Sequence, residues 1–150
     1  MPNKKQNLKT ETRVNPTARH DARRLILQAM YQWQLAATPL QEIEETFLIR
    51  HADQPFDRAY FKQLLHDIPT HREEIDQNIT PFLKRSLSDI DPIELAILRL
   101  ATYELLKCPD LPFRVVINEA LELTKQFGSV EGYKFVNSVV DRIAKHVKNT

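Results

Sequence analysis

The chain has 150 residues, of which 42% are apolar and 27% charged, and this size and balance predict one domain with a sizeable core. Only two glycines are present, which argues against collagen-like, low-complexity and disordered classes and against glycine-rich phosphate loops. A lone cysteine, Cys108, excludes an internal disulfide, and no apolar run is long enough for a signal peptide or membrane span, so we expect a cytoplasmic protein.

Positive charge gathers at the N-terminus, although the net charge of the chain is only +1. Residues 1–24 contain two acidic residues, Glu11 and Asp21, and the remainder of the chain is mildly acidic. This asymmetry favours a polyanion as one partner and a basic protein as another, and it predicts a basic flexible arm over residues 1–15. A solvated tail without a partner is the alternative. The basic residues of this region are Lys4, Lys5, Lys9, Arg13, Arg19, Arg23 and Arg24.

Prolines after N-capping residues divide the first half of the chain into helices. The first of these helices has an apolar stripe that includes Trp33, which predicts a core position for that ring. Thr38 opens the second helix in capping-box form. The helices are expected over about residues 16–37, 38–51, 57–67 and 70–78, with a short helical piece from Pro81.

The second half of the chain begins with its clearest helix start, Asp91 as N-cap with Glu94 placed to reach back to it. The helix that follows is apolar nearly all round, which predicts a place in the middle of a bundle. A sixth helix is expected to end at Gly128 in a left-handed conformation, and a seventh to run over about 131–147. Gly132 lies in its first turn, where a side chain would obstruct a close approach.

No segment shows the alternation of a strand, so the chain predicts an all-α fold of about seven helices. The five histidines have no metal-binding spacing, and no GxGxxG, Walker or GxSxG motif is present. We therefore expect no metal, no cofactor and no catalytic activity.

Two segments carry a resemblance to a known family. ARHDARRLILQAMYQWQL, residues 18–35, resembles the opening of the NusB family of bacterial transcription antitermination proteins, and LRLATYELL followed by PFRVVINEALELTKQFGSVEGYKFVNSVVDRI resembles its C-terminal half. The resemblance implies one all-helical domain over 16–150, built from two packed subdomains over about 16–88 and 89–150. The chain departs from the family pattern at His20 and Asp21, where arginines are often found, and at Ser138, where glycine is usual.

The resemblance also implies a function without catalysis. Members of the family bind boxA sequences in nascent ribosomal RNA, as a heterodimer with the basic ribosomal protein NusE, within an RNA polymerase antitermination complex. Two alternatives remain open for this chain: a protein-binding helical adaptor, and a detached copy of the NusB-like domain found in some RNA cytosine methyltransferases. An exposed apolar helix face would also allow a homodimer.

Candidate RNA-binding residues fall in two places. Arginines neutralise phosphates, and exposed rings stack on unpaired bases, so both residue types suit single-stranded RNA. The alternatives are a solvated face for the first helix, an intrahelical pair with Glu122 for Lys125, and a core position for Phe127. The candidates are Arg19, Arg23, Arg24, Gln28 and Tyr31 on the first helix, and Lys125, Phe127 and Lys134 around the glycine corner.

Two glutamates interrupt the apolar fifth helix, Glu94 and Glu104. The family implies that they belong to a partly acidic surface that meets NusE, and the acidic balance outside the arm fits a basic partner. The alternatives are a capping role for Glu94 and a rim charge for Glu104. Tyr103, on the same helix, is expected in the core.

Overall fold

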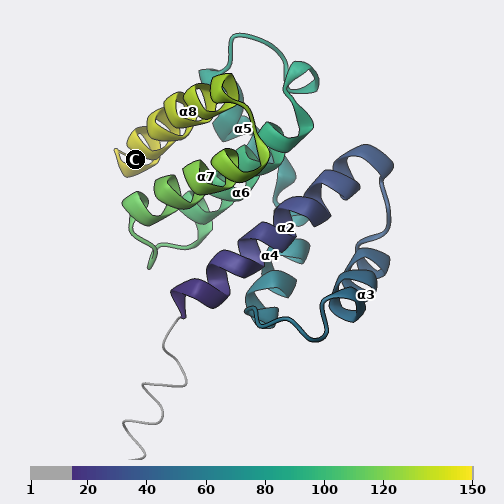
Figure 1. The fold of residues 1–150 in the computed structure, drawn as a ribbon. Helices are drawn as coiled ribbons and strands as arrows, with labels where there is room; N and C mark the ends of the chain where they lie inside the picture. The colour runs from purple at the N-terminus through teal and green to yellow at the C-terminus, as the bar shows by residue number, and fades with distance from the viewer. Residues whose placement is uncertain (1–14, 150) are drawn as a thin grey trace, which may run out of the picture.

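The computed structural model describes residues 15–149, so the predicted basic arm, apart from residue 15, lies outside the described residues. The described residues form seven α-helices and two short 3-10 helices without a strand, which confirms the all-α prediction (Figure 1). The helices are α2 (Pro16–Ala36), α3 (Leu40–Arg50), α4 (Arg58–Thr70), α5 (Arg72–Ile79), η1 (Thr80–Phe82), η2 (Leu87–Asp89), α6 (Pro92–Lys107), α7 (Phe113–Phe127) and α8 (Val130–Lys148).

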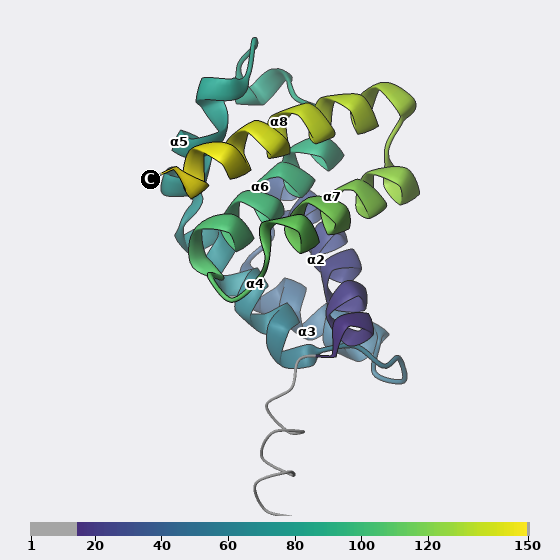
Figure 2. The same ribbon diagram turned by 90° about the vertical axis from the view of Figure 1, so that its left-hand side faces the viewer.

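Helix α6 is the centre of the molecule. Every residue from Leu95 to Leu105 is buried, and the helix packs against α2, α4, α5, α7 and α8 (Figure 2). Each large apolar side chain buried in this way contributes about 1.5–3 kcal/mol to stability. The prediction of a central helix is therefore confirmed. Tyr103 is buried as expected, and its hydroxyl donates a hydrogen bond to Asp67 Oδ2 at 2.6 Å.

The remaining helices lie around α6 in two groups. Helices α2, α3 and α4 pack on one another, and α7 and α8 pack together along α6 (Figure 1). Helix α5 packs chiefly on α6 and also touches α8. All seven helices contribute to one cluster of buried apolar side chains. The division into two subdomains near residue 88 therefore remains a prediction, because the core is continuous across it.

Local capping sets several helix ends, and two expectations about these ends are wrong. Asp91 caps α6 as predicted, accepting hydrogen bonds from the N–H groups of Ile93 and Glu94 at 2.9 and 3.2 Å. Thr38, in contrast, does not cap α3, whose N-cap is Pro39 without a side-chain hydrogen bond. Helix α4 also continues through Pro69 to Thr70, whereas the pattern predicted a break there.

The two glycines form the corner between α7 and α8, each for a steric reason. Gly128 has an extended conformation with φ of −110°, so the predicted left-handed residue is wrong. A Cβ at Gly128 would lie 2.9 Å from the Thr124 carbonyl oxygen. A Cβ at Gly132 would lie 2.7 Å from Glu94 Oε2 and 3.1 Å from Ser129 Oγ, so the predicted close approach is confirmed there.

Candidate nucleic-acid interface

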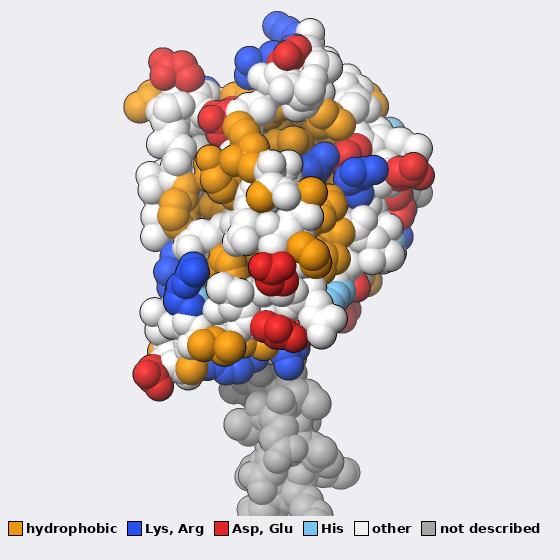
Figure 3. Space-filling model, turned by 90° about the vertical axis from the view of Figure 1, so that its right-hand side faces the viewer, with side chains coloured by type: hydrophobic (Ala, Val, Ile, Leu, Met, Phe, Trp, Pro, Cys, Tyr) orange, Lys and Arg blue, Asp and Glu red, His pale blue; other side chains and the backbone are white. Residues whose placement is uncertain are grey.

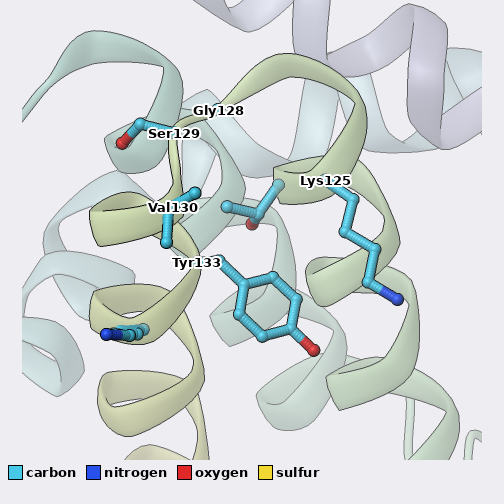
Figure 4. A pocket seen from close by; sticks show the side chains of 7 residues that line it. Lys125, Gly128, Ser129, Val130 and Tyr133 are labelled. Carbon is cyan, nitrogen blue, oxygen red and sulfur yellow. The ribbon is translucent and has the colours of Figure 1, made fainter.

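A pocket of about 370 Å³ opens at the corner between α7 and α8, and we call it the corner pocket. The ring of Tyr133 lies across it between the two helices, and Lys125 extends beside the ring from α7 (Figure 4). The Lys125 ammonium lies 5.8 Å from the centre of the ring, within the range of a cation–π contact. The pocket is lined by Thr124, Lys125, Gly128, Ser129, Val130, Tyr133 and Lys134.

A second pocket of about 390 Å³ lies between α8 and the segment after η1, and we call it the basic pocket. Four cationic side chains line it, and none forms an ion pair with an acidic side chain within residues 15–149. Two of the cations face rings: Arg85 lies 5.6 Å from the Phe135 ring centre and Arg142 lies 6.0 Å from that of Phe82. The lining residues are Phe82, Lys84, Arg85, Lys134, Phe135, Ser138, Val139 and Arg142.

Lys134 lines both pockets, so they form one continuous surface along α8. The sequence predicted Lys125 and Lys134, and the structure brings these two together at the corner pocket. It missed the rings of Tyr133 and Phe135, although both stand beside Lys134 in the same motif. Arg85 comes from a distant segment, and no local signal pairs it with Phe135.

Phe127 does not line the corner pocket. Its side chain is half-buried and packs against the apolar core, which agrees with the alternative drawn from the apolar stripe of α7. The pocket presents the ring of Tyr133 instead, since that side chain projects between the helices (Figure 4). A stacking role for Phe127 is therefore a weaker proposal than one for Tyr133.

Arg23 and Glu104 are buried together, which makes two expectations about them wrong. Arg23 is only 2% exposed, and Glu104 only 1%. Arg23 Nε donates a hydrogen bond to Glu104 Oε2 at 2.8 Å, and the Tyr60 hydroxyl donates to the same carboxylate. Arg23 is therefore not on an exposed face of α2. Glu104 is neither a rim charge nor part of an acidic surface that could meet NusE, because its carboxylate is buried. The sequence contained one indication of this burial. Arg23 lies seven residues, or about two helical turns, before the apolar Met30, so both side chains are on the same side of the helix.

Burial governs the ionisation of this network. Burial raises the pKa of Glu104, while the charge of Arg23 and the hydrogen bond from Tyr60 lower it. Burial and the nearby Glu104 carboxylate also raise the pKa of the Tyr60 hydroxyl above its ordinary value. On the solvent side, Glu119 Oε1 lies 3.4 Å from Arg23 Nη1, and Glu119 Oε2 lies 2.6 Å from His20 Nδ1. The network therefore ties α2 to α4, α6 and α7.

The other predicted residues of α2 lie away from the two pockets. The Arg19 guanidinium stacks 4.0 Å above the Tyr60 ring centre, and its Nε lies 3.6 Å from Asp57 Oδ2. Arg24 forms an ion pair with Asp21 at 3.6 Å, so the aspartate that stands where the family often has arginine partly neutralises Arg24. Gln28 is half-buried and Tyr31 is 38% exposed. None of the four lines the corner pocket or the basic pocket.

Glu94 lies at the start of α6, beside the corner between α7 and α8. The Glu94 carboxylate lies against Gly132 of α8, and burial and the neighbouring Asp91 raise its pKa, whereas Arg85 opposes the rise. Gln34 Nε2 donates a hydrogen bond to the Pro92 carbonyl at 2.9 Å, which holds the end of α2 beside this point.

Exposed apolar side chains accompany this end of α2. Tyr31 and Leu35 lie one turn apart on the helix and are 38% and 58% exposed. Figure 3 shows hydrophobic side chains gathered over the middle of the face seen from the right of Figure 1, with charged side chains mainly around them. Such a gathering, rimmed by polar groups, is typical of a surface that meets another protein.

No described helix combines the length and apolar character needed to cross a membrane. No three His, Cys, Asp or Glu side chains within residues 15–149 are grouped so that they would hold a metal ion.

The all-helical fold and the basic, ring-lined surface are those of a small helical nucleic-acid-binding protein. Comparison with known proteins identifies the family. The NusB family model matches residues 20–145. The transcription antitermination protein NusB of Pseudomonas fluorescens (strain Pf0-1) is 48% identical over 130 residues, covering 87% of this chain and 78% of that protein. NusB of Shewanella piezotolerans is 44% identical over 135 residues, covering 90% of this chain and all of that protein. This chain belongs to the NusB family.

Solved structures agree in fold. T. maritima NusB superposes with a TM-score of 0.73 at 30% identity, covering 89% of this chain and 93% of that one. A crystal structure of the antitermination factors NusB and NusE in complex with dsRNA contains a chain that superposes with a TM-score of 0.77 at 26% identity, covering 85% of this chain and 96% of that one.

Proposed function

We propose that this protein is an RNA-binding transcription antitermination factor without catalytic activity, which recognises boxA-type sequences in nascent ribosomal RNA together with NusE. The observation that carries the proposal is the basic pocket, where four cations that form no ion pair within residues 15–149 lie around two aromatic rings. Cations neutralise phosphates and rings stack on unpaired bases, the combination that single-stranded RNA requires. The solved relative that combines NusB, NusE and RNA supports the same assembly. Work on nascent transcripts within an RNA polymerase complex would place the protein in the cytoplasm.

The RNA path follows α8. Lys84, Arg85, Lys134 and Arg142 contact phosphates at the basic pocket, and Lys125 adds charge at the corner. The partly or fully exposed candidates of α2 extend the path along that helix, while Arg23 stays out of it because it is buried. Those residues are Arg19, Arg24, Gln28 and Tyr31. Phe127 is left out of the path, because it packs against the core and lines neither pocket.

A double substitution tests the phosphate contacts. Lys84→Gln with Arg142→Gln removes two exposed cations, and the slope of log affinity for a boxA-like RNA against log salt is expected to fall by about 1.4, at about 0.7 per phosphate of a single strand. Filter binding over a salt series measures the slope. Arg50→Gln with Lys62→Gln, two exposed cations on α3 and α4, is the control and keeps the wild-type slope. An identical slope for both double variants would exclude the basic pocket from RNA binding.

Charge reversal at Glu94 tests the partner face. Glu94→Lys is expected to weaken NusE binding at least tenfold, about 1.4 kcal/mol, because a basic partner then meets a like charge. Calorimetry with NusE measures the affinity, and thermal melting checks the fold. Glu45→Lys, on the exposed side of α3, is the matched control and leaves NusE affinity unchanged. If the melting temperature falls while the NusE affinity of the folded protein is unchanged, Glu94 only stabilises α6 and its contact with α8.

The exposed apolar face near Leu35 favours one alternative, a protein-binding adaptor without specific RNA recognition. The two functions differ in one measurement, the affinity for boxA-like and scrambled RNA with and without NusE. A preference for the boxA-like RNA supports the antitermination factor. Equal affinities in every condition support the adaptor.

A further inference from the structure

The corner pocket offers an aromatic ring that the rest of the protein leaves uncovered. Tyr133 is only half-buried, and its hydroxyl has no hydrogen-bond partner within residues 15–149. Gly128 lines the same pocket and carries no side chain to cover the ring (Figure 4). Beside it, Val130 is 70% exposed and adds apolar surface at the edge of the pocket. The ring and its apolar surroundings are therefore open to a flat ligand.

The charges around this pocket favour an anionic ligand. No acidic residue lines the pocket, whereas Lys125 and Lys134 stand on its two helices. Lys134 continues into the basic pocket, where Arg85 and Arg142 lie. An apolar slot bordered by cations and joined to a cationic track matches a nucleotide chain, whose bases are flat and whose linkages are anionic.

Lys125 is free to serve such a ligand. Its contact with Glu122 at 3.5 Å joins two side chains that are each 59% exposed, and a surface pair of this kind holds a lysine only weakly. Its other neighbour is the Tyr133 ring at 5.8 Å. A base that covers this ring takes the place of the ammonium, which is then within reach of a neighbouring phosphate.

We propose that the corner pocket is a subsite for one unpaired RNA base, stacked on Tyr133, with Lys125 and Lys134 on the phosphates at either side. This inference rests on the proposed RNA binding and names the residue that holds a base. Tyr133 takes the role that the sequence suggested for Phe127, because Phe127 packs against the core whereas Tyr133 lines the pocket.

Paired substitutions test the subsite. Tyr133→Leu is expected to weaken binding of a boxA-like single-stranded RNA about fivefold to a hundredfold, the range that corresponds to loss of one base–ring stack, with an unchanged salt slope. Tyr133→Phe keeps the ring and retains nearly wild-type affinity. Phe127→Leu is the matched control and leaves the RNA affinity of the folded protein unchanged. Thermal melting of each variant verifies that it is folded.

Abasic RNA tests the same contact with the wild-type protein, so the test does not depend on a variant that folds. One abasic nucleotide is placed in turn at each position of the boxA-like RNA, and one position is expected to lose affinity by the factor seen for Tyr133→Leu. That position gives no further loss with Tyr133→Leu.

Two outcomes separate this subsite from the broader function. If Tyr133→Leu binds as the wild type does, while Lys84→Gln with Arg142→Gln lowers the salt slope, the subsite is wrong and RNA binding stands. If the wild-type protein binds neither boxA-like nor scrambled RNA, with or without NusE, both proposals are wrong.

Discussion

Replacement of Arg23 by methionine is expected to lower the free energy of unfolding by about 3–5 kcal/mol, which is the cost of leaving a buried charge without its partner. Glu104 is 1% exposed and receives its shortest cationic contact from Arg23 Nε at 2.8 Å. Methionine fills much of the arginine's volume, so the loss of stability comes from the unpaired Glu104 carboxylate rather than from a cavity. Urea denaturation at pH 7 measures it.

Two comparisons isolate the buried charge. Arg24→Met removes the neighbouring arginine, whose ion pair with Asp21 at 3.6 Å is partly exposed, and it is expected to cost no more than about 1 kcal/mol. Arg23→Met combined with Glu104→Met removes both charges and is expected to recover much of the stability lost in the single variant. A single Arg23→Met variant as stable as Arg24→Met would show that water reaches Glu104.

The same variant has a predictable response to pH. Without Arg23, burial raises the pKa of Glu104 further, so the folded state binds a proton more tightly than the unfolded state. A group whose pKa is raised by folding contributes stability at low pH and loses it as pH rises through the folded pKa. The deficit of Arg23→Met relative to wild type is therefore expected to shrink as pH falls from 7 toward the ordinary glutamate pKa. Urea titrations across this range measure the trend.

Alanine at Gly128 is expected to destabilise the protein by about 1–3 kcal/mol, the usual cost of forcing a methyl group into filled space. The new Cβ would lie 2.9 Å from the Thr124 carbonyl oxygen and 3.0 Å from Thr124 Cγ2. That carbonyl also accepts the Gly128 N–H at 2.7 Å, and it belongs to the last turn of α7, so it cannot move without opening the corner. The loss is steric, because φ at this position suits any residue.

Gly132→Ala is the comparison that tests this reasoning. Its Cβ would meet the carboxylate end of Glu94, which is a flexible side chain, and alanine within α8 gains about 0.8–1.0 kcal/mol of helix propensity. We expect this variant to lie within about 1 kcal/mol of the wild type, so the two variants differ by a few degrees in melting temperature. Equal losses of stability in Gly128→Ala and Gly132→Ala would mean that the Glu94 side chain cannot move away from the new methyl group.

The sequence alone determined the all-α class, the order of the helices and the corner with both glycines. These features depend on contacts within a few residues. Asp91 caps the helix that follows it directly, and the apolar character of Leu95 to Leu105 predicts a buried helix whatever surrounds it. The family motif lies in the same local segments, and it pointed to Lys125 and Lys134 at the corner.

Only the tertiary structure decided which charges face solvent and which rings face a pocket. Arg23 and Glu104 are separated by 81 residues, so the local pattern around each could not reveal that the two neutralise one another inside the core. Arg85 likewise reaches Phe135 only because α8 packs beside the segment after η1. A helical period places a side chain on a face, whereas burial depends on which other helix covers that face, and this is set by packing between distant segments.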